Sequence, residues 1–291
     1  MMSPTPYAEV IGDPIAHSKS PLIHGFWLGK LGLEGAYRAT RVTTDELHLY
    51  LAERRRDPSW RGCNVTMPLK RAVVPYAGRL SDDTSVLGAA NLLLPDGQGV
   101  LRAENSDVRG VAEPLSRLPR ADYPGHVATY VQIIGSGGAA FAAGLGAARA
   151  GFGDFDVFCR SREQGLTLAG LIGTPFGECQ SIDALGPIRN PDSGPEDQRY
   201  SHVIINATPL GMAGQPEVPV DLSSYYPDTI VFEMVYHPLE TGLVKQARAL
   251  GLRVIDGVDM LVAQGARAFE AFYGHSAPRE HDAELRRLLI Q

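Results

Sequence analysis

The stretch VQIIGSGGAAFAAGLGAARAGF, residues 131–152, joins an apolar strand, a glycine loop and an alanine-rich helix. Gly135, Gly137 and Ala140 follow the spacing GxGxxA directly after the strand. Glycines there allow a tight turn and a close approach of the backbone to a pyrophosphate, and the helix N-terminus offers free N–H groups. The stretch therefore predicts a dinucleotide-binding βα unit, although tight packing of a strand against a helix would also require such glycines.

Short apolar strands alternate with helical segments on both sides of this unit, which is typical of an α/β fold with a parallel sheet. Before the unit, we expect strands at 7–12, 37–42 and 60–67 and helices at 20–32 and 44–56. Residues 89–107 are typical of a hairpin that turns at Asp96 and Gly97. After the unit, strands are expected within 154–160, 203–212, 229–238 and 252–258, and a helix at 259–274. We expect a linker at 112–126 and an exposed loop at 186–202, because both tracts are polar and rich in Pro.

Composition narrows the function classes. The chain has 291 residues, 44% of them hydrophobic and 21% charged, with a net charge of −6. This length suits two domains, and an acidic chain without a basic stripe is an unlikely partner for nucleic acid. No long apolar run or signal-peptide pattern occurs, so we expect a cytoplasmic protein without a membrane partner. Cys63, Cys159 and Cys179 form no CxxC pair, and HExxH is absent, so neither a disulfide framework nor a metal site is expected.

The end of the strand after the glycine loop bears on the choice of cofactor. An acidic residue there binds the ribose of NAD, whereas a nearby arginine favours the 2′-phosphate of NADP. This chain has Cys159, Arg160, Ser161 and Arg162 at that point and no acid. Arg160 is suited to hold a 2′-phosphate or to stack on adenine, although both arginines could equally be solvated surface charges. The sequence favours NADP and leaves NAD open.

Several local motifs, taken together, resemble the shikimate dehydrogenase family, which includes the quinate/shikimate dehydrogenases. The matching pieces are GDPIAHSKSPLIHG (12–25), GCNVTMPLK (62–70), GAANLLL (88–94), ENSD (104–107), IIGSGGAA (133–140), VIINATPLGM (203–212) and DGVDMLVAQGA (256–266). They follow the family's order from residue 12 to residue 266. The motifs SKSP and NVTxPxK are distinctive in combination, whereas the glycine loop alone is not.

The resemblance implies a catalytic pair, Lys70 and Asp107, in an enzyme that reversibly reduces the ring ketone of 3-dehydroshikimate with NADPH. An ammonium beside a carboxylate can hydrogen-bond a reacting hydroxyl and stabilise charge on its oxygen. Proton transfer by one of the two groups would add general acid–base catalysis. Which of the two transfers the proton stays open.

The resemblance also implies two sets of binding residues and no metal. Hydroxyls of Ser18 and Ser20 would bind the substrate carboxylate with Thr66 nearby, while Lys19 points away because neighbours in an extended segment face opposite sides. The substrate set is Ser18, Ser20, Thr66, Asn91, Tyr236 and Gln264. The cofactor set is Gly135, Ser136, Gly137, Gly138, Ala139, Arg160, Thr208, Gly257 and Met260.

Three stretches depart from the family pattern. The tripeptide from Cys159 to Ser161 replaces a common NRT, which again leaves NAD open, and AANLL replaces AVNT, which removes a hydroxyl beside Asn91. GVDM replaces GLGM and puts Asp259 where a glycine is common near the nicotinamide. An added carboxylate there would alter the cofactor fit or cap the following helix, and we favour the cap.

These observations predict two α/β domains with the active site between them. Residues 1–110 would bind substrate, with C-terminal helices 258–291 packing back on them, and residues 111–257 would form a Rossmann-type NADP-binding domain. The expected function is a shikimate dehydrogenase of chorismate and aromatic amino-acid biosynthesis, acting on a small molecule as a monomer or homodimer. The alternatives are an NAD-dependent quinate/shikimate or amino-analogue dehydrogenase and a non-catalytic nucleotide-binding regulatory protein.

Overall fold

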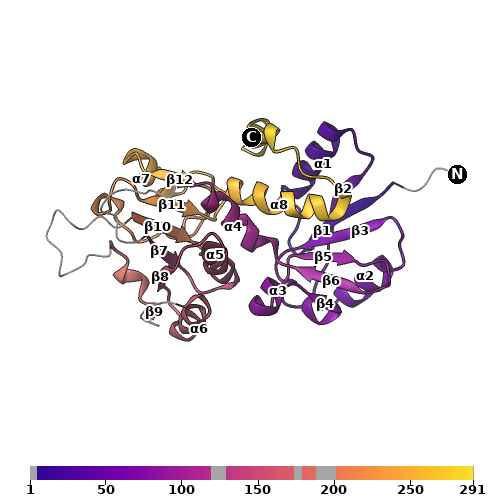
Figure 1. Ribbon diagram of the computed structural model, residues 1–291, viewed down its shortest axis with the longest axis horizontal. Helices are drawn as coiled ribbons and strands as arrows, with labels where there is room; N and C mark the ends of the chain where they lie inside the picture. Colours follow the sequence, from indigo (N-terminus) through magenta and orange to yellow (C-terminus); the bar gives the residue numbers. More distant parts are fainter. Residues whose placement is uncertain (1–4, 119–128, 174–178, 188–200, 291) are drawn as a thin grey trace. The chain divides into compact units, whose positions relative to one another are not determined.

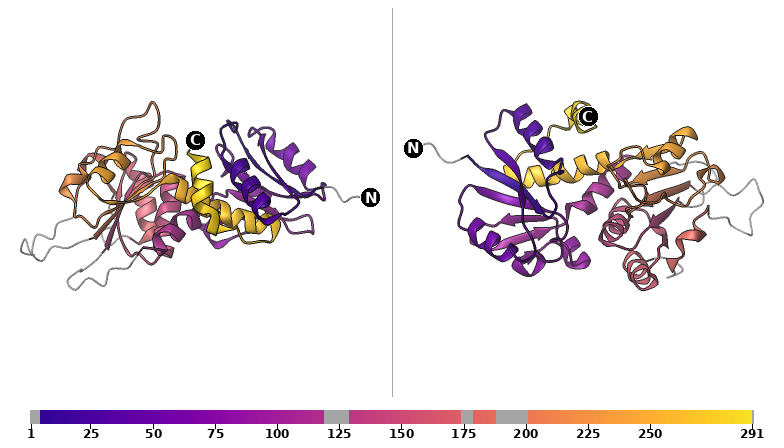
Figure 2. Two further views of the ribbon diagram at one scale, coloured as in Figure 1. Left: turned by 90° about the horizontal axis from the view of Figure 1, so that it is seen from above. Right: turned by 180° about the vertical axis from the view of Figure 1, so that it is seen from behind.

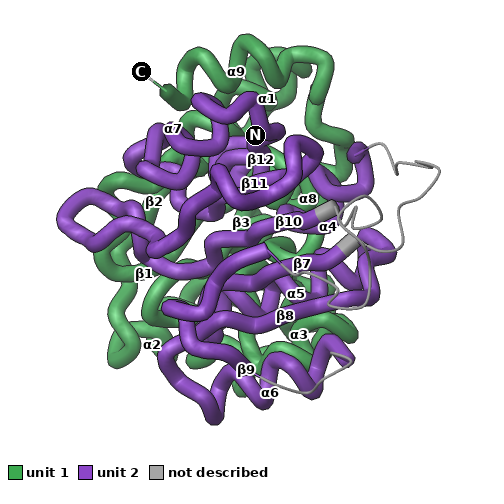
Figure 3. The backbone as a smooth tube through the Cα atoms, turned by 90° about the vertical axis from the view of Figure 1, so that its left-hand side faces the viewer, with its two compact units in different colours: residues 1–109, 262–291 green, residues 110–261 purple. Residues whose placement is uncertain are grey.

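The computed structural model describes residues 5–118, 129–173, 179–187 and 201–290. The chain divides into two compact units, Met1–Arg109 with Val262–Gln291 as unit 1 and Gly110–Leu261 as unit 2 (Figure 3). Two helices contain residues of both units, α4 (Ser106–Ser116) and α8 (Gly257–Tyr273). Among the described residues, none of the helices combines the length and the apolar character that a membrane crossing requires.

Unit 1 is built on a mixed sheet whose described strands lie in the order β2-β1-β3-β5-β6-β4 (Figure 1). β1 runs parallel to β2 and β3, β5 runs antiparallel to β3 and β6, and β4 runs parallel to β6. The strands are β1 (Tyr7–Gly12), β2 (Ala36–Arg41), β3 (Trp60–Val65), β4 (Arg79–Leu80), β5 (Leu92–Pro95) and β6 (Leu101–Glu104). The helices within unit 1 are α1 (Ser20–Leu31), α2 (Leu47–Arg54), α3 (Asp82–Leu87) and α9 (Asp282–Leu289), with 3-10 turns η1 (Val74–Tyr76) and η4 (Arg279–His281).

The two faces of the unit 1 sheet bury different side chains, because successive residues of a strand point to opposite faces. Ile11 of β1 packs in one apolar cluster with Leu51 of α2. Ala8 of the same strand packs in another cluster with Phe272 of α8. Both faces are therefore covered by helices.

Unit 2 contains a parallel sheet whose described strands lie in the order β12-β11-β10-β7-β8-β9. This is the doubly wound order of a Rossmann fold, in which the chain leaves the first strand, β7, in one direction and returns on its other side with β10. The strands are β7 (Thr129–Ile134), β8 (Asp154–Phe158), β9 (Cys179–Gln180), β10 (Ser201–Asn206), β11 (Ile230–Glu233) and β12 (Arg253–Ile255). The helices within unit 2 are α5 (Gly138–Arg149), α6 (Arg162–Ile172) and α7 (Gly242–Ala249), with η2 (Ile182–Ala184) and η3 (Leu222–Ser224).

Helices cover both faces of the unit 2 sheet, as the further views show (Figure 2). Val203 and Ile205 of β10 pack in the cluster that contains Ala143 of α5. Ile204, which lies between them in the strand, packs with Leu243 of α7 on the other face. A strand buried on both faces reads as a continuous apolar run, and VIIN at the end of β10 has this character. The α/β fold class is thus confirmed.

The hairpin expectation is confirmed, since β5 and β6 pair antiparallel and Pro95 faces Leu101 across the turn. The expected linker is wrong over its first part, because residues 112–116 continue α4 with Pro114 inside the helix. Val108, Val111 and Leu115 are buried at helical spacing, and their burial outweighs the one backbone bond that a proline removes. Residues 119–126 of that tract and 188–200 of the expected loop lie outside the described residues.

Candidate active site

One edge of the unit 1 sheet collects most of the substrate-side residues that the sequence points to. β1 and β3 are parallel, so their carboxyl ends meet at this edge, where Asp13 N–H donates to Met67 O at 3.0 Å. β5 is antiparallel to β3 and begins at the same edge, and Val65 N–H donates to Asn91 O at 2.8 Å. β6 is antiparallel to β5 and ends there, just before Asp107.

Lys70 and Asp107 form an ion pair at this edge. Lys70 Nζ donates to Asp107 Oδ2 at 2.6 Å, and the side chains are 35% and 14% exposed. Lys70 is fixed through its backbone, since its carbonyl accepts from Ala90 N–H at 2.8 Å. Asp107 lies in the first turn of α4, where a helix favours negative charge. An ammonium that is paired yet still reachable can donate to a reacting oxygen.

Asn91 orients the other oxygen of this carboxylate. Its Nδ2 donates to Asp107 Oδ1 at 2.9 Å and to Gln264 Oε1 at 3.2 Å. Its Oδ1 accepts from Ser106 N–H at 2.7 Å and from Ser106 Oγ at 3.2 Å. These four hydrogen bonds form in one orientation of the Asn91 amide only. Asn91 therefore holds both the Asp107 carboxylate and Gln264 of α8 in place. The sequence reasoning did not single out Ser106, although it lies within the quoted ENSD motif.

Ser18, Ser20 and Thr66 lie on the two segments that leave β1 and β3. Ser18 Oγ accepts from Ser20 N–H at 3.3 Å, which is a local turn bond at the start of α1. Helix α1 has Lys19 at its N-cap, and no side chain caps it. Thr66 N–H donates to Ile11 O at 2.9 Å, so Thr66 continues the pairing of β3 with β1. All three side chains are partly exposed, as donors to a ligand must be.

Two further residues join these segments to the ion pair. Tyr37 of β2 donates its hydroxyl to Asn64 Oδ1 at 2.7 Å. Asn64 of β3 donates to Asn91 O at 3.2 Å. His24 stacks on the Tyr37 ring at 4.0 Å between centroids, and its burial lowers the His24 pKa to about 3, so this contact is uncharged. The sequence reasoning missed Tyr37 and Asn64, and Asn64 stands within the motif NVTxPxK.

In unit 2 the glycine loop meets the loop after β10. Gly135 follows β7 with φ of +120°, and a Cβ added there would lie 3.0 Å from Ala207 O and from Thr208 Cγ2. Glycine is therefore required both by conformation and by space. β7 and β10 are neighbours in the sheet, and their loops diverge at the switch point where open α/β sheets bind ligands.

The start of α5 has the character of an anion site. Gly137 is the N-cap residue of α5 and has no side chain that could cap the helix. Among the described residues, no atom outside the adjacent chain lies within 4 Å of a Cβ added to Gly137 or Gly138. Ala139 in the first turn is exposed, and Ser136 Oγ donates to Gln164 Oε1 of α6 at 3.5 Å. The first-turn N–H groups and the open backbone fit a pyrophosphate. Arg160, just beyond β8, is exposed.

Helix α8 begins with a reciprocal cap. Asp256 Oδ1 accepts from the N–H groups of Val258 at 3.1 Å and Asp259 at 3.3 Å, and Asp259 Oδ2 accepts from Asp256 N–H at 3.2 Å. Asp259 therefore caps the helix, as the sequence reasoning favoured. A Cβ on Gly257 would lie 2.7 Å from Val235 O, so this glycine lets the helix lie close to the segment that follows β11. Met260 packs against the apolar core of unit 2.

The loop after β10 is tied by its own side chains. Thr208 Oγ1 donates to Asn206 Oδ1 at 2.7 Å and accepts from Leu210 N–H at 3.1 Å. Tyr236 follows β11 and is 44% exposed. Lys70, Asp107, Asn91, Gln264, Ser18, Ser20 and Thr66 thus belong to unit 1, whereas Tyr236 and the cofactor set belong to unit 2.

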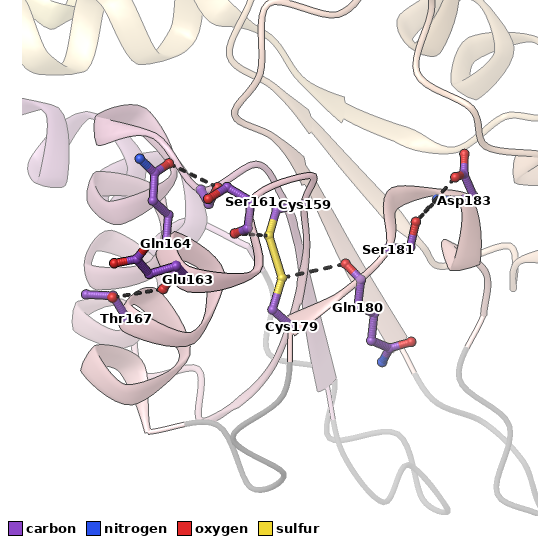
Figure 4. The surroundings of a disulfide bond; sticks show 10 residues. Cys159, Ser161, Glu163, Gln164, Thr167, Cys179, Gln180, Ser181 and Asp183 are labelled. Carbon is purple, nitrogen blue, oxygen red and sulfur yellow. Dashed lines mark hydrogen bonds between the residues drawn. A yellow bond between two sulfur atoms is a disulfide. The ribbon is translucent and has the colours of Figure 1, made fainter.

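A disulfide joins Cys159 to Cys179 (Figure 4), which corrects the expectation of no disulfide. The reason is the pairing of β9 with β8, which places Phe158 opposite Gln180 and brings the cysteine Cα atoms within 6.7 Å. Cys63 is free and buried. In the described ranges, no group of three or more His, Cys, Asp or Glu side chains is arranged to hold a metal ion.

Comparisons with known proteins point to one family. A family model described as the shikimate dehydrogenase substrate binding domain matches residues 10–93, and one described as the shikimate 5'-dehydrogenase C-terminal domain matches residues 257–284. The shikimate dehydrogenase (NADP+) of Sphingopyxis alaskensis is 45% identical over 98% of this chain and 97% of its own length. That of Rhodopseudomonas palustris is 37% identical over 99% and 97%. The crystal structure of Thermus thermophilus shikimate 5-dehydrogenase with NADP(H) and shikimate gives a TM-score of 0.79 at 30% identity, covering 98% of this chain and 99% of that one.

Proposed function

The chain belongs to the shikimate dehydrogenase family, and on this premise we propose that it reversibly reduces 3-dehydroshikimate to shikimate with NADPH. The observation that carries the proposal is the Lys70–Asp107 ion pair with its second carboxylate oxygen held by Asn91. A carbonyl that gains a hydride becomes an alkoxide, and this oxygen needs a proton and a nearby positive charge. Lys70 is partly exposed and brings the positive charge at Nζ, and the Lys70–Asp107 pair supplies the proton.

In this mechanism Lys70 Nζ donates to the substrate oxygen at which charge develops, and Asp107 keeps the amine oriented. Asn91 and Gln264 hydrogen-bond neighbouring ring hydroxyls, since each amide can donate and accept. Either Lys70 or Asp107 passes the proton, because both are joined by one 2.6 Å hydrogen bond.

The substrate carboxylate is assigned to Ser18, Ser20 and Thr66. Neutral hydroxyl donors offset the cost of removing a carboxylate from water without adding a second cation beside Lys70. The hydrogen bond from Asn64 Nδ2 to Asn91 O supports this assignment, because Asn64 lies on β3 two residues before Thr66 and Asn91 lies beside Asp107.

NADPH supplies the hydride when it is bound. Residues Gly135 to Ala139 would hold its pyrophosphate at the start of α5, and Arg160 would hold the 2′-phosphate. Thr208, Gly257 and Met260 would line the nicotinamide side together with Tyr236. Residues 1–110 with 258–291 would then bind substrate, and residues 111–257 would bind NADP. We expect a cytoplasmic monomer or homodimer with small-molecule partners only.

An initial-rate panel tests the proposal, with shikimate and quinate each offered with NADP and NAD. We expect the highest kcat/KM for shikimate with NADP. Preference for quinate or NAD would instead support the quinate/shikimate alternative, and an inert protein that still binds dinucleotide would support the regulatory one.

A further inference from the structure

Glu233, the last residue of β11, is a buried carboxylate to which the mechanism above gives no role. Its side chain is fully buried, with 0% exposure. Three groups donate to it: Asn206 Nδ2 at 2.9 and 3.1 Å, Val235 N–H at 2.9 Å and Thr241 Oγ1 at 2.9 Å. A buried carboxylate is costly unless such bonds satisfy it, so its retention requires an explanation.

The donors connect Glu233 to segments that carry proposed ligand-binding residues. Asn206 Oδ1 accepts from Thr208 N–H at 3.1 Å and from Thr208 Oγ1 at 2.7 Å, and Asn206 Nδ2 also donates to Leu210 O at 3.0 Å. The carboxylate fixes which way the Asn206 amide faces, because only Nδ2 can donate to it. With Nδ2 turned to Glu233, Oδ1 must face Thr208.

The second donor fixes the end of β11. Val235 N–H is held by Glu233 Oε1, and the next residue is Tyr236. The third donor, Thr241, is the N-cap of α7 and also accepts from Val244 N–H at 3.2 Å. One carboxylate thus holds the loop 207–212, the segment that leads to Tyr236 and the start of α7.

We propose that Glu233 is a positioning residue for the cofactor, because its ionised carboxylate sets the Asn206 amide and through it the loop that carries Thr208. The proposal rests on the proposed function only for the identity of the ligand. A glutamine at this position keeps one acceptor oxygen but turns an NH₂ group toward donors, so the arrangement of Asn206 and Thr208 is lost.

The ionisation of Glu233 falls in a range that experiments reach. Burial raises the pKa of Glu233 to about 7, and the charge of Glu217 raises it too, whereas the bonds from Val235, Asn206 and Thr241 lower it. On protonation one oxygen becomes an O–H that faces donors instead of accepting from them. Glu217 provides a matched control, because it is an exposed carboxylate near Glu233 that accepts from Gly242 N–H at 3.1 Å and does not bond Asn206 or Thr208.

The test measures the dissociation constant of NADPH by fluorescence from pH 6 to 9 for the full chain. We expect Glu233→Gln to weaken NADPH binding about tenfold at pH 8, as expected for one displaced hydrogen bond to a charged group. The affinity of the wild type should fall as the pH drops through 7, whereas that of Glu233→Gln should change less. Glu217→Gln should bind NADPH with a dissociation constant within about twofold of that of the wild type, and with the same pH dependence as the wild type.

A double-mutant cycle separates positioning from a general loss of stability. Thr208→Val removes the hydroxyl that donates to Asn206. In this background, the factor by which Glu233→Gln weakens NADPH binding should be at least about threefold smaller than in the wild type. Additive effects, or a folded Glu233→Gln that binds NADPH as the wild type does, would overturn the proposal. If Glu233→Gln does not fold, the pH profile of the wild type decides. The proposal is overturned if the NADPH affinity of the wild type and that of Glu217→Gln both show no change near pH 7. Shikimate turnover is measured separately, so its absence would count against the proposed function and not against Glu233.

Discussion

The two units each place a carboxylate at a strand end, and the two carboxylates are satisfied in opposite ways. Asp107 in unit 1 accepts from an ammonium and an amide and is 14% exposed. Among the described residues, Glu233 in unit 2 accepts from neutral donors and is fully buried. An ion pair at an accessible edge can exchange a partner for a ligand, whereas a buried acceptor of neutral donors can only hold its surroundings. The comparison separates groups that react from groups that position.

The largest effect is expected from removing the ammonium in unit 1. Lys70→Ala should lower kcat about 10³-fold, or about 4 kcal/mol in the barrier, because the positive charge and the hydrogen bond to the reacting oxygen are lost. NADPH affinity should stay within about twofold of the wild type, since the proposed cofactor residues lie in unit 2. Steady-state rates and fluorescence titration measure the two quantities.

Lys30→Ala is the matched control for this lysine. Lys30 pairs with Glu284 at 2.6 Å, with side chains 30% and 43% exposed. Exposed pairs contribute about 1 kcal/mol or less, so turnover should not change and stability should change little. A near-normal kcat in Lys70→Ala would contradict a reactive role for the Lys70–Asp107 pair.

The pH dependence of stability tests the unit 2 side of the comparison. The pKa of Glu233 is raised by burial from its ordinary value of 4.5 to about 7, so the folded protein binds this proton more tightly than the unfolded chain does. Stability from this group is therefore present below pH 4.5 and is lost as the pH rises to 7, by on the order of 3 kcal/mol. Denaturant titrations at pH 5 to 8 should show this loss in the wild type but not in Glu233→Gln. If the free energy of unfolding changes equally with pH in the wild type and in Glu233→Gln, this prediction is contradicted.

The hydroxyl donors of unit 1 should give a smaller effect that is confined to the acid substrate. Ser18→Ala and Ser20→Ala should each raise the KM for shikimate about tenfold, because a hydrogen bond to a charged group contributes about 1.5–3 kcal/mol. The KM for NADP should not change. Ser85→Ala removes an exposed hydroxyl that donates to Ser81 O at 3.0 Å and serves as control. If neither serine variant alters the KM for shikimate, the two hydroxyls act only within the helix start.

The smallest effect is expected at the start of α8. Asp259→Ala should destabilise the protein by about 1 kcal/mol, the usual contribution of a helix cap, without changing the choice between NADP and NAD. Melting temperature and a pair of cofactor KM values decide between this outcome and a direct role of Asp259 at the cofactor. A shift in the NADP to NAD ratio with unchanged stability would favour the direct role.

The elements were largely predictable, because their apolar periodicity is local. Continuous apolar runs predicted β7, β10 and β11, and Asp96 and Gly97 predicted the hairpin of β5 and β6. Helix α4 was missed because Pro114 and the surrounding charges concealed the spacing of its buried residues.

The candidate site was predictable only through resemblance, because its contacts are long-range. Lys70 and Asp107 meet since β3, β5 and β6 share one edge of a sheet, and no local spacing encodes this. Glu233 was missed because a single carboxylate at the end of an apolar strand looks like the first residue of a turn. The disulfide was missed because β9 has two residues and no apolar run to predict its pairing with β8.

The Cys159–Cys179 bond closes a stretch of chain that contains α6, at the edge of the unit 2 sheet. A protease that cuts one peptide bond between these cysteines therefore leaves both products joined through sulfur. The nicked chain would run as one band on a denaturing gel without reductant and as two bands with it. Fragment size under the two conditions thus maps the cut and tests the crosslink in a single experiment.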